Sequence, residues 1–292
     1  MGRGMTDSPS ELIGAWLRRQ LPKASAKWFE DHLAKLVADP SARSQDVLLG
    51  LIPRRLGKAD LALDSADLAA ADRARPGWDP TGWSVDEAAR IRVLRDTGES
   101  PEPFAARFTE LCRSADVAEA IALYRGLPLY PVSVALDSQA AEGVRTNIRS
   151  IFEAVAHRNP YPRERFDENR WNQMVLKALF IGSALAPIQG LDERANPELA
   201  EILGDYAHER WAAGRAVTPE LWRCIGPFAE GAALADLERV VRTGDETERK
   251  AAALALSASP HAAASDLLKD LGEFAAAVAK GDLTWDVLAR DQ

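Results

Sequence analysis

The amino-acid sequence predicts an all-α protein of antiparallel helical hairpins, packed as a degenerate HEAT/armadillo-like α-solenoid or as another multi-helix array. Apolar residues recur at spacings of three and four along almost the whole chain, which is the spacing of one helix face. Alternating runs of Val, Ile and Thr, which indicate strands, are nearly absent. The connections are short and contain Gly or Pro, so consecutive helices are expected to be antiparallel neighbours.

The predicted helices follow one another from the first residues to the last. Many open on Ser, Asp or Asn, whose side chains accept hydrogen bonds from the free amides of a first turn. Their starts are expected near Ser8, Lys23, Ser44, Ser65, Ser84, Glu102, Asp116, Asp137, Asp167, Asn196, Pro219, Ala229, Asp245 and Ser265. The pattern also predicts one helix from Ser138 to His157 and a helix over 167–183 that is buried on all sides.

Length and composition are those of a folded protein of one or two domains. The chain has 292 residues, of which 47% are hydrophobic and 27% charged. The stretch from Ala74 to Pro80 resembles a linker, which gives an N-terminal helical lobe over 1–80 and a main helical domain over 81–292, or else one continuous domain. The net charge of -8 argues against a nucleic-acid partner, because such a surface must neutralise phosphates.

The sequence lacks the common catalytic and targeting signals. No signal-peptide core and no apolar run long enough for a membrane span is present, so a cytoplasmic protein is expected. GxGxxG, P-loop, GxSxG, HExxH and DDxxD patterns are absent. Four histidines and two distant cysteines, Cys112 and Cys224, do not match metal-ligand spacing. We therefore predict no catalytic residue, no metal and no cofactor.

The segment DYAHERWAAGR, residues 205–215, gathers side chains that are common in active sites. On a helix, however, Tyr206 and Trp211 fall on the apolar arc and His208 on the acidic, solvated face. Arg210 points into the middle of the apolar arc, where a guanidinium needs a partner. That partner is either an internal acid or the carboxylate or phosphate of a ligand; the candidate acids are Glu153, Asp167 and Asp192.

Two further positions admit a structural and a functional interpretation. Lys177 lies in an otherwise apolar part of the 167–183 helix, where it either extends its amine to solvent or forms a desolvated base or Schiff-base amine. His157 ends a predicted helix just before Asn159 and Tyr161. The RNPYP loop that contains them either lines a cleft or only forms the turn that its Asn and Pro residues favour.

Several strings between Arg145 and Phe228 resemble the EboA family: RNPYP, WNQMVLKALF, RANPEL and DYAHERWAAGR. The resemblance implies a gene cluster that makes or exports a secondary metabolite and that also encodes a UbiA-like prenyltransferase, a TatD-like hydrolase, and proteins similar to sugar isomerases and dehydroquinate synthase. It supplies no catalytic residue. The characteristic residues of the family correspond here to Asn159, Tyr161, Trp171, Asn172, Lys177, Asp192, Arg194, Asn196, Tyr206, His208, Arg210, Trp211, Arg215 and Trp222.

The function expected from this resemblance is a non-catalytic helical scaffold, adaptor or carrier. Its expected partners are the other proteins of the cluster, including the UbiA-like prenyltransferase, together with a small-molecule metabolite. The alternative is a binding protein or enzyme that takes an anionic or prenylated metabolite in a cleft near Arg210 and Lys177. The candidate ligand-binding residues are Arg210, Lys177, Asn172, Trp211, Tyr206, Asp192, Arg194, His157, Asn159 and Tyr161.

Overall fold

The computed structural model describes residues 8–98 and 100–290. Within these ranges the chain forms helices and turns, with a single isolated bridge between Asp60 and Ser84, so the all-α prediction is confirmed. None of the described helices combines the length and the apolar character needed to cross a bilayer. Contacts divide the chain into two compact units, unit 1 up to Asp167 and unit 2 from Glu168. The domain boundary expected near residue 80 falls inside unit 1 and stays a prediction, as does the HEAT-like arrangement.

Unit 1 contains ten α-helices among its described residues, and most begin where the sequence signals them. Ser8, Ser84 and Asp116 are N-caps whose side chains accept from the amide three residues on, as expected of these residue types. The elements are α1 (Pro9–Gln20), α2 (Lys23–Ala38), α3 (Ala42–Leu56), α4 (Ser65–Ala74), α5 (Val85–Thr97), α6 (Pro101–Ser114), α7 (Val117–Arg125), η1 (Leu127–Leu129), α8 (Val134–Arg145), α9 (Arg149–Ala156) and α10 (Tyr161–Arg165).

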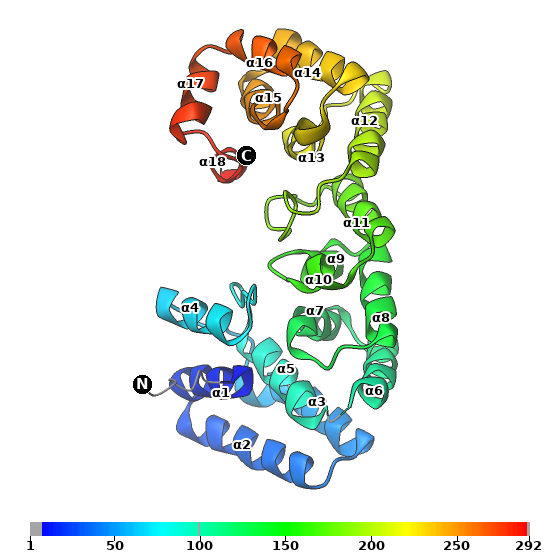
Figure 1. Cartoon of the computed structure of the whole chain (residues 1–292). Helices are drawn as coiled ribbons and strands as arrows, with labels where there is room; N and C mark the ends of the chain where they lie inside the picture. The colour runs from blue at the N-terminus through cyan, green and yellow to red at the C-terminus, as the bar shows by residue number, and fades with distance from the viewer. Residues whose placement is uncertain (1–7, 99, 291–292) are drawn as a thin grey trace, which may run out of the picture. The chain divides into compact units, whose positions relative to one another are not determined.

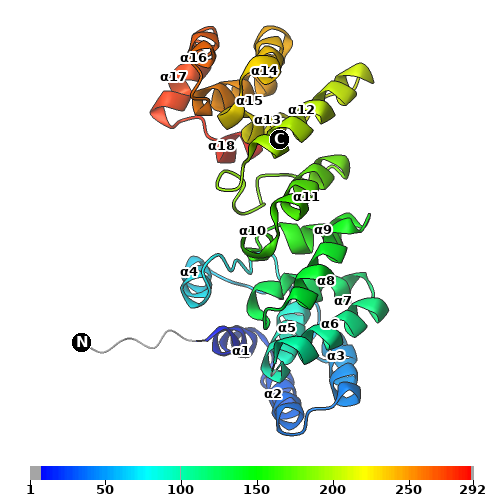
Figure 2. The ribbon, with the colours of Figure 1, turned by 45° about the vertical axis from the view of Figure 1, so that its right-hand side comes forward.

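Helix α5 forms the centre of unit 1. It contacts α1, α2, α3 and α7, and Figure 2 shows it between these elements. Ala88, Ala89 and Ile91 have no exposed surface, and even the charged pair Asp86 and Arg90 is buried, with 2.8 Å between Oδ2 and Nη1. A buried ion pair of this kind is retained only when both groups have partners.

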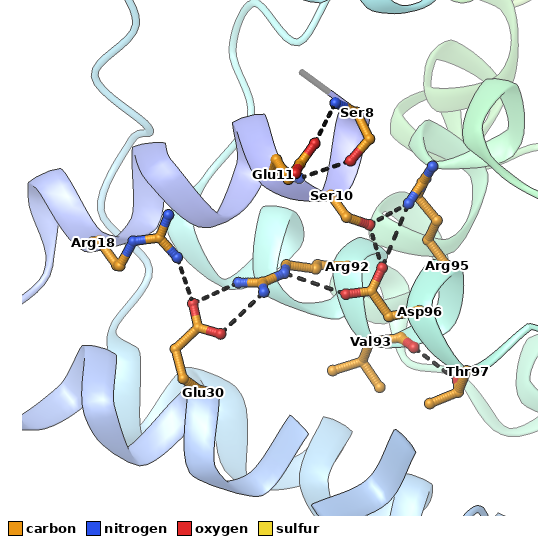
Figure 3. A network of polar contacts seen from close by, with 10 residues as sticks. All are labelled: Ser8, Ser10, Glu11, Arg18, Glu30, Arg92, Val93, Arg95, Asp96 and Thr97. Carbon is orange, nitrogen blue, oxygen red and sulfur yellow. Dashed lines mark hydrogen bonds and ion pairs between the residues drawn. The ribbon is translucent and has the colours of Figure 1, made fainter. Parts of the chain in front are cut away.

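Charged side chains join α5 to α1 and α2 (Figure 3). Arg92 of α5 donates two hydrogen bonds to Glu30 of α2, at 2.7 and 3.0 Å, and Arg18 of α1 donates a third at 3.0 Å. On its other side the Arg92 guanidinium lies 3.3 Å from Asp96. Burial raises the pKa of the Glu30 carboxyl, but the hydrogen bonds and charges of Arg92 and Arg18 lower it more, so its pKa is below the ordinary value. The network therefore fixes three helices through one ionised carboxylate.

The helix predicted from Ser138 to His157 is two helices, α8 and α9, and the prediction was wrong at the break. The hydroxyl of Thr146 accepts a hydrogen bond from the Ile148 amide at 3.1 Å, which replaces a helical bond. Ile148, which follows the break, is 44% exposed. Each short helix carries a surface ion pair, Glu142 with Arg145 in α8 and Arg149 with Glu153 in α9.

Unit 2 is arranged around α15, whose residues from Ala251 to Leu256 are all buried. Helices α13, α14, α16, α17 and α18 contact it, and Gly226 of η3 lies so close that an added Cβ would sit 2.5 Å from the Ala255 carbonyl oxygen. A side chain therefore cannot be accommodated there without moving η3. The elements are α11 (Glu168–Phe180), α12 (Pro197–Ala212), η2 (Pro219–Leu221), α13 (Trp222–Ile225), η3 (Gly226–Phe228), α14 (Gly231–Thr243), α15 (Glu246–Ala258), α16 (Ala262–Lys269), α17 (Glu273–Lys280) and α18 (Trp285–Arg290).

Helix α11 is buried on one face only, which corrects the expectation that it is buried on all sides. Trp171, Met174 and Val175 are fully buried, but Phe180 at the end of the helix is 62% exposed. The helix stops there because Gly182 follows with a φ of 67°, a conformation that ends an α-helix and that glycine adopts without strain.

Candidate functional site

Several candidate residues of unit 2 fasten the loop that joins α11 to α12. The side-chain amides of Asn172 and Asn196 exchange hydrogen bonds of 2.9 and 3.3 Å, and Asn196 also caps α12 by accepting from the Leu199 amide at 2.8 Å. Asn172 is only 1% exposed, and the pairing of its buried amide with Asn196 joins α11 to the start of α12.

The same loop is held further along by a salt bridge and a cation–π contact. Asp192 accepts two hydrogen bonds of 2.7 Å from Arg223, and this pairing lowers the pKa of the Asp192 carboxyl. The Arg194 guanidinium carbon lies 4.7 Å from the centre of the Trp171 ring. The two contacts join the loop to α13 and α11.

Glu220, which the sequence analysis missed, is the buried charge of this region. It is 5% exposed, and its two carboxylate oxygens accept from the amides of Leu185 at 2.8 Å and Ala186 at 2.9 Å. A carboxylate that satisfies two loop amides stabilises the loop, because the Leu185 donor is buried and the Ala186 donor is partly buried. No local signal could have identified it, since its partners lie about 35 residues earlier in the chain.

Arg210 is half-buried and binds a backbone carbonyl, not an acid. Its Nε donates to the Ala216 oxygen at 3.0 Å, which closes the turn after α12. The ion pair predicted with Glu153, Asp167 or Asp192 is therefore wrong: Arg210 sits in the last turn of α12, and the chain folds back onto it within six residues. Tyr206 is buried beside it and donates to the Leu179 carbonyl at 3.3 Å. Lys177 is half-buried on α11.

The candidates His157, Asn159 and Tyr161 lie in unit 1, so the predicted site residues are divided between two compact units. Asn159 closes the RNPYP turn: its side chain donates to the Tyr124 and Ala154 carbonyls at 3.2 Å each and accepts from the Tyr161 amide at 3.0 Å. His157, Arg158 and Asn159 line a cavity of about 140 Å³. The RNPYP loop therefore forms a turn and also borders a small cavity.

A larger cavity lies in unit 2 between α12 and α14, both labelled in Figure 1. Its volume is about 650 Å³, within the range of about 300–1,000 Å³ typical of small-molecule sites. Ala200, Ala232 and Ala233 give its walls small apolar surfaces, and Phe228 adds an aromatic ring. Neither Arg210 nor Lys177 lines it.

Acidic side chains and two histidines supply the polar part of this lining. Glu201 and Asp205 come from α12, and Glu230 and Asp236 come from the residue before α14 and from α14 itself. His208 of α12 reaches across to Asp236, with Nε2 at 2.9 and 2.8 Å from the two carboxylate oxygens. The second histidine of the lining is His261.

Trp211 lies one turn after His208 on α12, and its ring packs against neighbouring side chains behind the cavity wall formed by that helix. Its ring centre lies 6.0 Å from that of His208 and 5.9 Å from that of Trp222, and the Arg239 guanidinium carbon lies 4.2 Å from it. Trp211 is half-buried and does not line the cavity. It therefore supports the wall that carries His208 and is not itself a contact for a ligand there.

Gly204 stands in the middle of α12 and faces the cavity. A glycine inside a helix costs about 0.8–1.0 kcal/mol relative to alanine. Packing against the protein does not require it, because a Cβ added at Gly204 meets no atom within 4 Å. The missing side chain leaves helix backbone exposed to whatever fills the cavity, which is a common use of glycine in binding sites.

The cavity lining has no hydroxyl, thiol or amine side chain. It contains no Ser, Thr, Cys, Lys or Tyr, so His208 and Asp236 have no hydroxyl or thiol to activate. The two cysteines lie elsewhere, and burial raises the pKa of Cys112 to about 11 and that of Cys224 to about 12.

We expect both thiols to be almost unreactive in the folded protein. With a pKa near 11, roughly one Cys112 thiol in a thousand is ionised at pH 8, and the thiolate is the reactive form. Alkylation by iodoacetamide at pH 8, followed by intact mass, should leave the native chain unmodified on the time scale in which urea-unfolded chain takes up two groups. Rapid labelling of native Cys112 would contradict the burial that raises its pKa.

Comparison with known proteins gives one family. Residues 9–226, about three quarters of the chain, match a family described as metabolite traffic protein EboA. The matched region includes all of α12 and ends before α14, so it covers one wall of the cavity. No curated protein and no solved structure shows a significant match.

Proposed function

Because this chain belongs to the EboA family of metabolite traffic proteins, we propose that it is a non-catalytic carrier that holds a small metabolite in the α12–α14 cavity. The cavity carries the proposal: about 650 Å³ is enough for a compound of drug-like size, and its apolar walls and few polar groups are those of a binding site. The description of the family fits binding and release better than conversion.

The lining favours a carrier over an enzyme that uses a hydroxyl, thiol or amine nucleophile. His208 is oriented by Asp236, as a general base would be, but none of the lining residues offers such a group for it to activate. Traffic also requires delivery, so the proposal includes transfer of the compound to another protein of the same gene cluster, such as the UbiA-like prenyltransferase.

We expect the full-length protein to retain a compound from an extract of the cells that produce it. Native mass spectrometry would detect the added mass, and a thermal shift would detect stabilisation, since a ligand that binds only the folded state raises its stability. Gly204→Trp should abolish both signals, because a Cβ at this position meets no atom within 4 Å and the indole would occupy the cavity.

Ala212→Trp is the matched control, since Ala212 is exposed at the end of α12 and does not line the cavity. It should bind as the wild type does. Retention of the compound by Gly204→Trp, with a far-UV spectrum unchanged from wild type, would place binding elsewhere and overturn the assignment of this cavity. Recovery of partner proteins with no bound compound would favour the scaffold expected from the sequence.

A further inference from the structure

The charge of the α12–α14 cavity indicates which class of ligand it binds. This inference rests on the carrier function proposed above. Four carboxylates line the cavity, from Glu201, Asp205, Glu230 and Asp236, and its lining contains no Lys or Arg. A concave surface with charge of one sign concentrates ions of the opposite sign. From this geometry we infer that the cavity accepts an organic cation: an apolar body between the alanine walls, with a protonated nitrogen at the carboxylates.

The carboxylates at the cavity are available to such a ligand. Glu201, Asp205 and Glu230 have no hydrogen-bonded or ion-paired side chain within the part of the chain that the structure describes, although Arg and Lys side chains neutralise acids at many other places in it. Asp236 pairs with His208 from the opposite wall. The three unpaired acids therefore add negative charge to one volume without an internal counter-ion.

The apolar walls of the cavity indicate the shape of the uncharged part of the ligand. Ala200 and Gly204 on α12 face Ala232 and Ala233 on α14 across the cavity, so the surfaces present methyl groups and backbone instead of long side chains. Gly204 lets a ligand approach the helix backbone directly, since nothing in the protein occupies the space next to its Cα. Smooth apolar walls of this kind suit a ring system.

This ligand class differs from the anionic metabolite expected near Arg210 and Lys177. The guanidinium of Arg210 is bound to the Ala216 carbonyl, and neither side chain reaches the cavity lining. An anion in the cavity would face three unpaired acids with no Lys or Arg in the lining to offset them, and repulsion at such distances weakens binding by about tenfold or more.

The test uses two fluorescent probes that share one ring system and differ in charge, 9-aminoacridine as the cation and acridine-9-carboxylate as the anion. Titrated against the full-length protein at low salt, the cation is expected to bind at least about tenfold more tightly than the anion. Its affinity should fall as salt is added, because salt screens the carboxylates. Equal or tighter binding of the anion would overturn the inference.

Charge variants locate the effect. Glu201→Gln/Asp205→Asn should weaken binding of 9-aminoacridine by about tenfold, whereas Glu198→Gln/Glu209→Gln, the same change of net charge on exposed positions of α12 outside the lining, should leave it unchanged. Equal losses in the two double variants would show that the cation responds only to the overall charge of the protein, and the site would be rejected.

Gly204→Trp separates this inference from the carrier proposal. If both probes bind wild type equally and neither binds Gly204→Trp, the cavity binds small molecules but does not select cations. If neither probe binds while a compound from the extract is retained by wild type and lost in Gly204→Trp, the cation inference fails and the carrier proposal stands. If neither the probes nor the extract yields a bound compound, both fail.

Discussion

Glu220→Ala is expected to lower the free energy of unfolding of unit 2 by about 3–5 kcal/mol, since each unsatisfied buried donor costs roughly 1–3 kcal/mol and the lost side chain leaves a void. The Leu185 and Ala186 amides would lose their only described acceptor, a carboxylate that is 5% exposed. Urea unfolding followed by tryptophan fluorescence measures the loss. Hydrogen exchange should accelerate at these two amides first.

Glu220→Gln tests the mechanism of that loss. The glutamine keeps the shape and one acceptor oxygen, but its amide nitrogen faces a backbone N–H, so we expect an intermediate destabilisation of about 1–3 kcal/mol. Glu198→Ala is the control for loss of one acid, because Glu198 is exposed on α12. A loss in Glu220→Ala no larger than in this control would mean that the loop is held by its other contacts alone.

Asp137→Ala is expected to lower the free energy of unfolding of unit 1 by about 2–4 kcal/mol, less than for a fully buried ion pair because Arg165 can rehydrate. Asp137 is 6% exposed; it accepts from the Tyr161 hydroxyl at 2.7 Å and from Arg165 at 3.0 and 2.7 Å, which ties α8 to α10. Burial and the hydrogen bond to Asp137 raise the pKa of Tyr161, so its hydroxyl stays a donor.

Tyr161→Phe is the matched variant for this cluster. It removes one hydrogen bond but leaves Asp137 paired with Arg165, so the expected loss is about 1–2 kcal/mol. Chemical denaturation of the full-length protein, with far-UV circular dichroism as the signal, ranks the two variants. A loss in Asp137→Ala equal to or below that in Tyr161→Phe would show that Arg165 contributes nothing through Asp137.

Helix starts could be predicted because the signals are local. Asn196, followed by Pro197, predicts a cap and a first turn, and the structure shows the Asn196 side chain accepting from the amide three residues on. The break between α8 and α9 was missed because the apolar spacing continues through it. The hydrogen bond from the Ile148 amide to Thr146 at the break competes with the helical pattern.

The candidate site was less predictable because it depends on contacts between distant segments. The sequence placed His208 on the acidic, solvated face of its helix, and its side chain is indeed 49% exposed. What that face meets, however, is α14, and Asp236 lies 28 residues further along the chain. Gly204 lowers the stability of a helix, and the sequence alone does not show the open space beside it. The sequence predicts an internal acid or an anionic ligand as the partner of Arg210, but its Nε donates to the Ala216 carbonyl, six residues later in the chain.

Because the chain is divided into two compact units, a ligand is expected to change the melting temperature of only the unit that binds it. Each unit has its own buried core, so unfolding is expected to proceed in two steps, and a single melting temperature would not describe the chain. The α12–α14 cavity belongs wholly to the second unit. By thermodynamic linkage, a bound metabolite should raise only the transition of that unit. The transition of the first unit then serves as an internal reference within the same molecule.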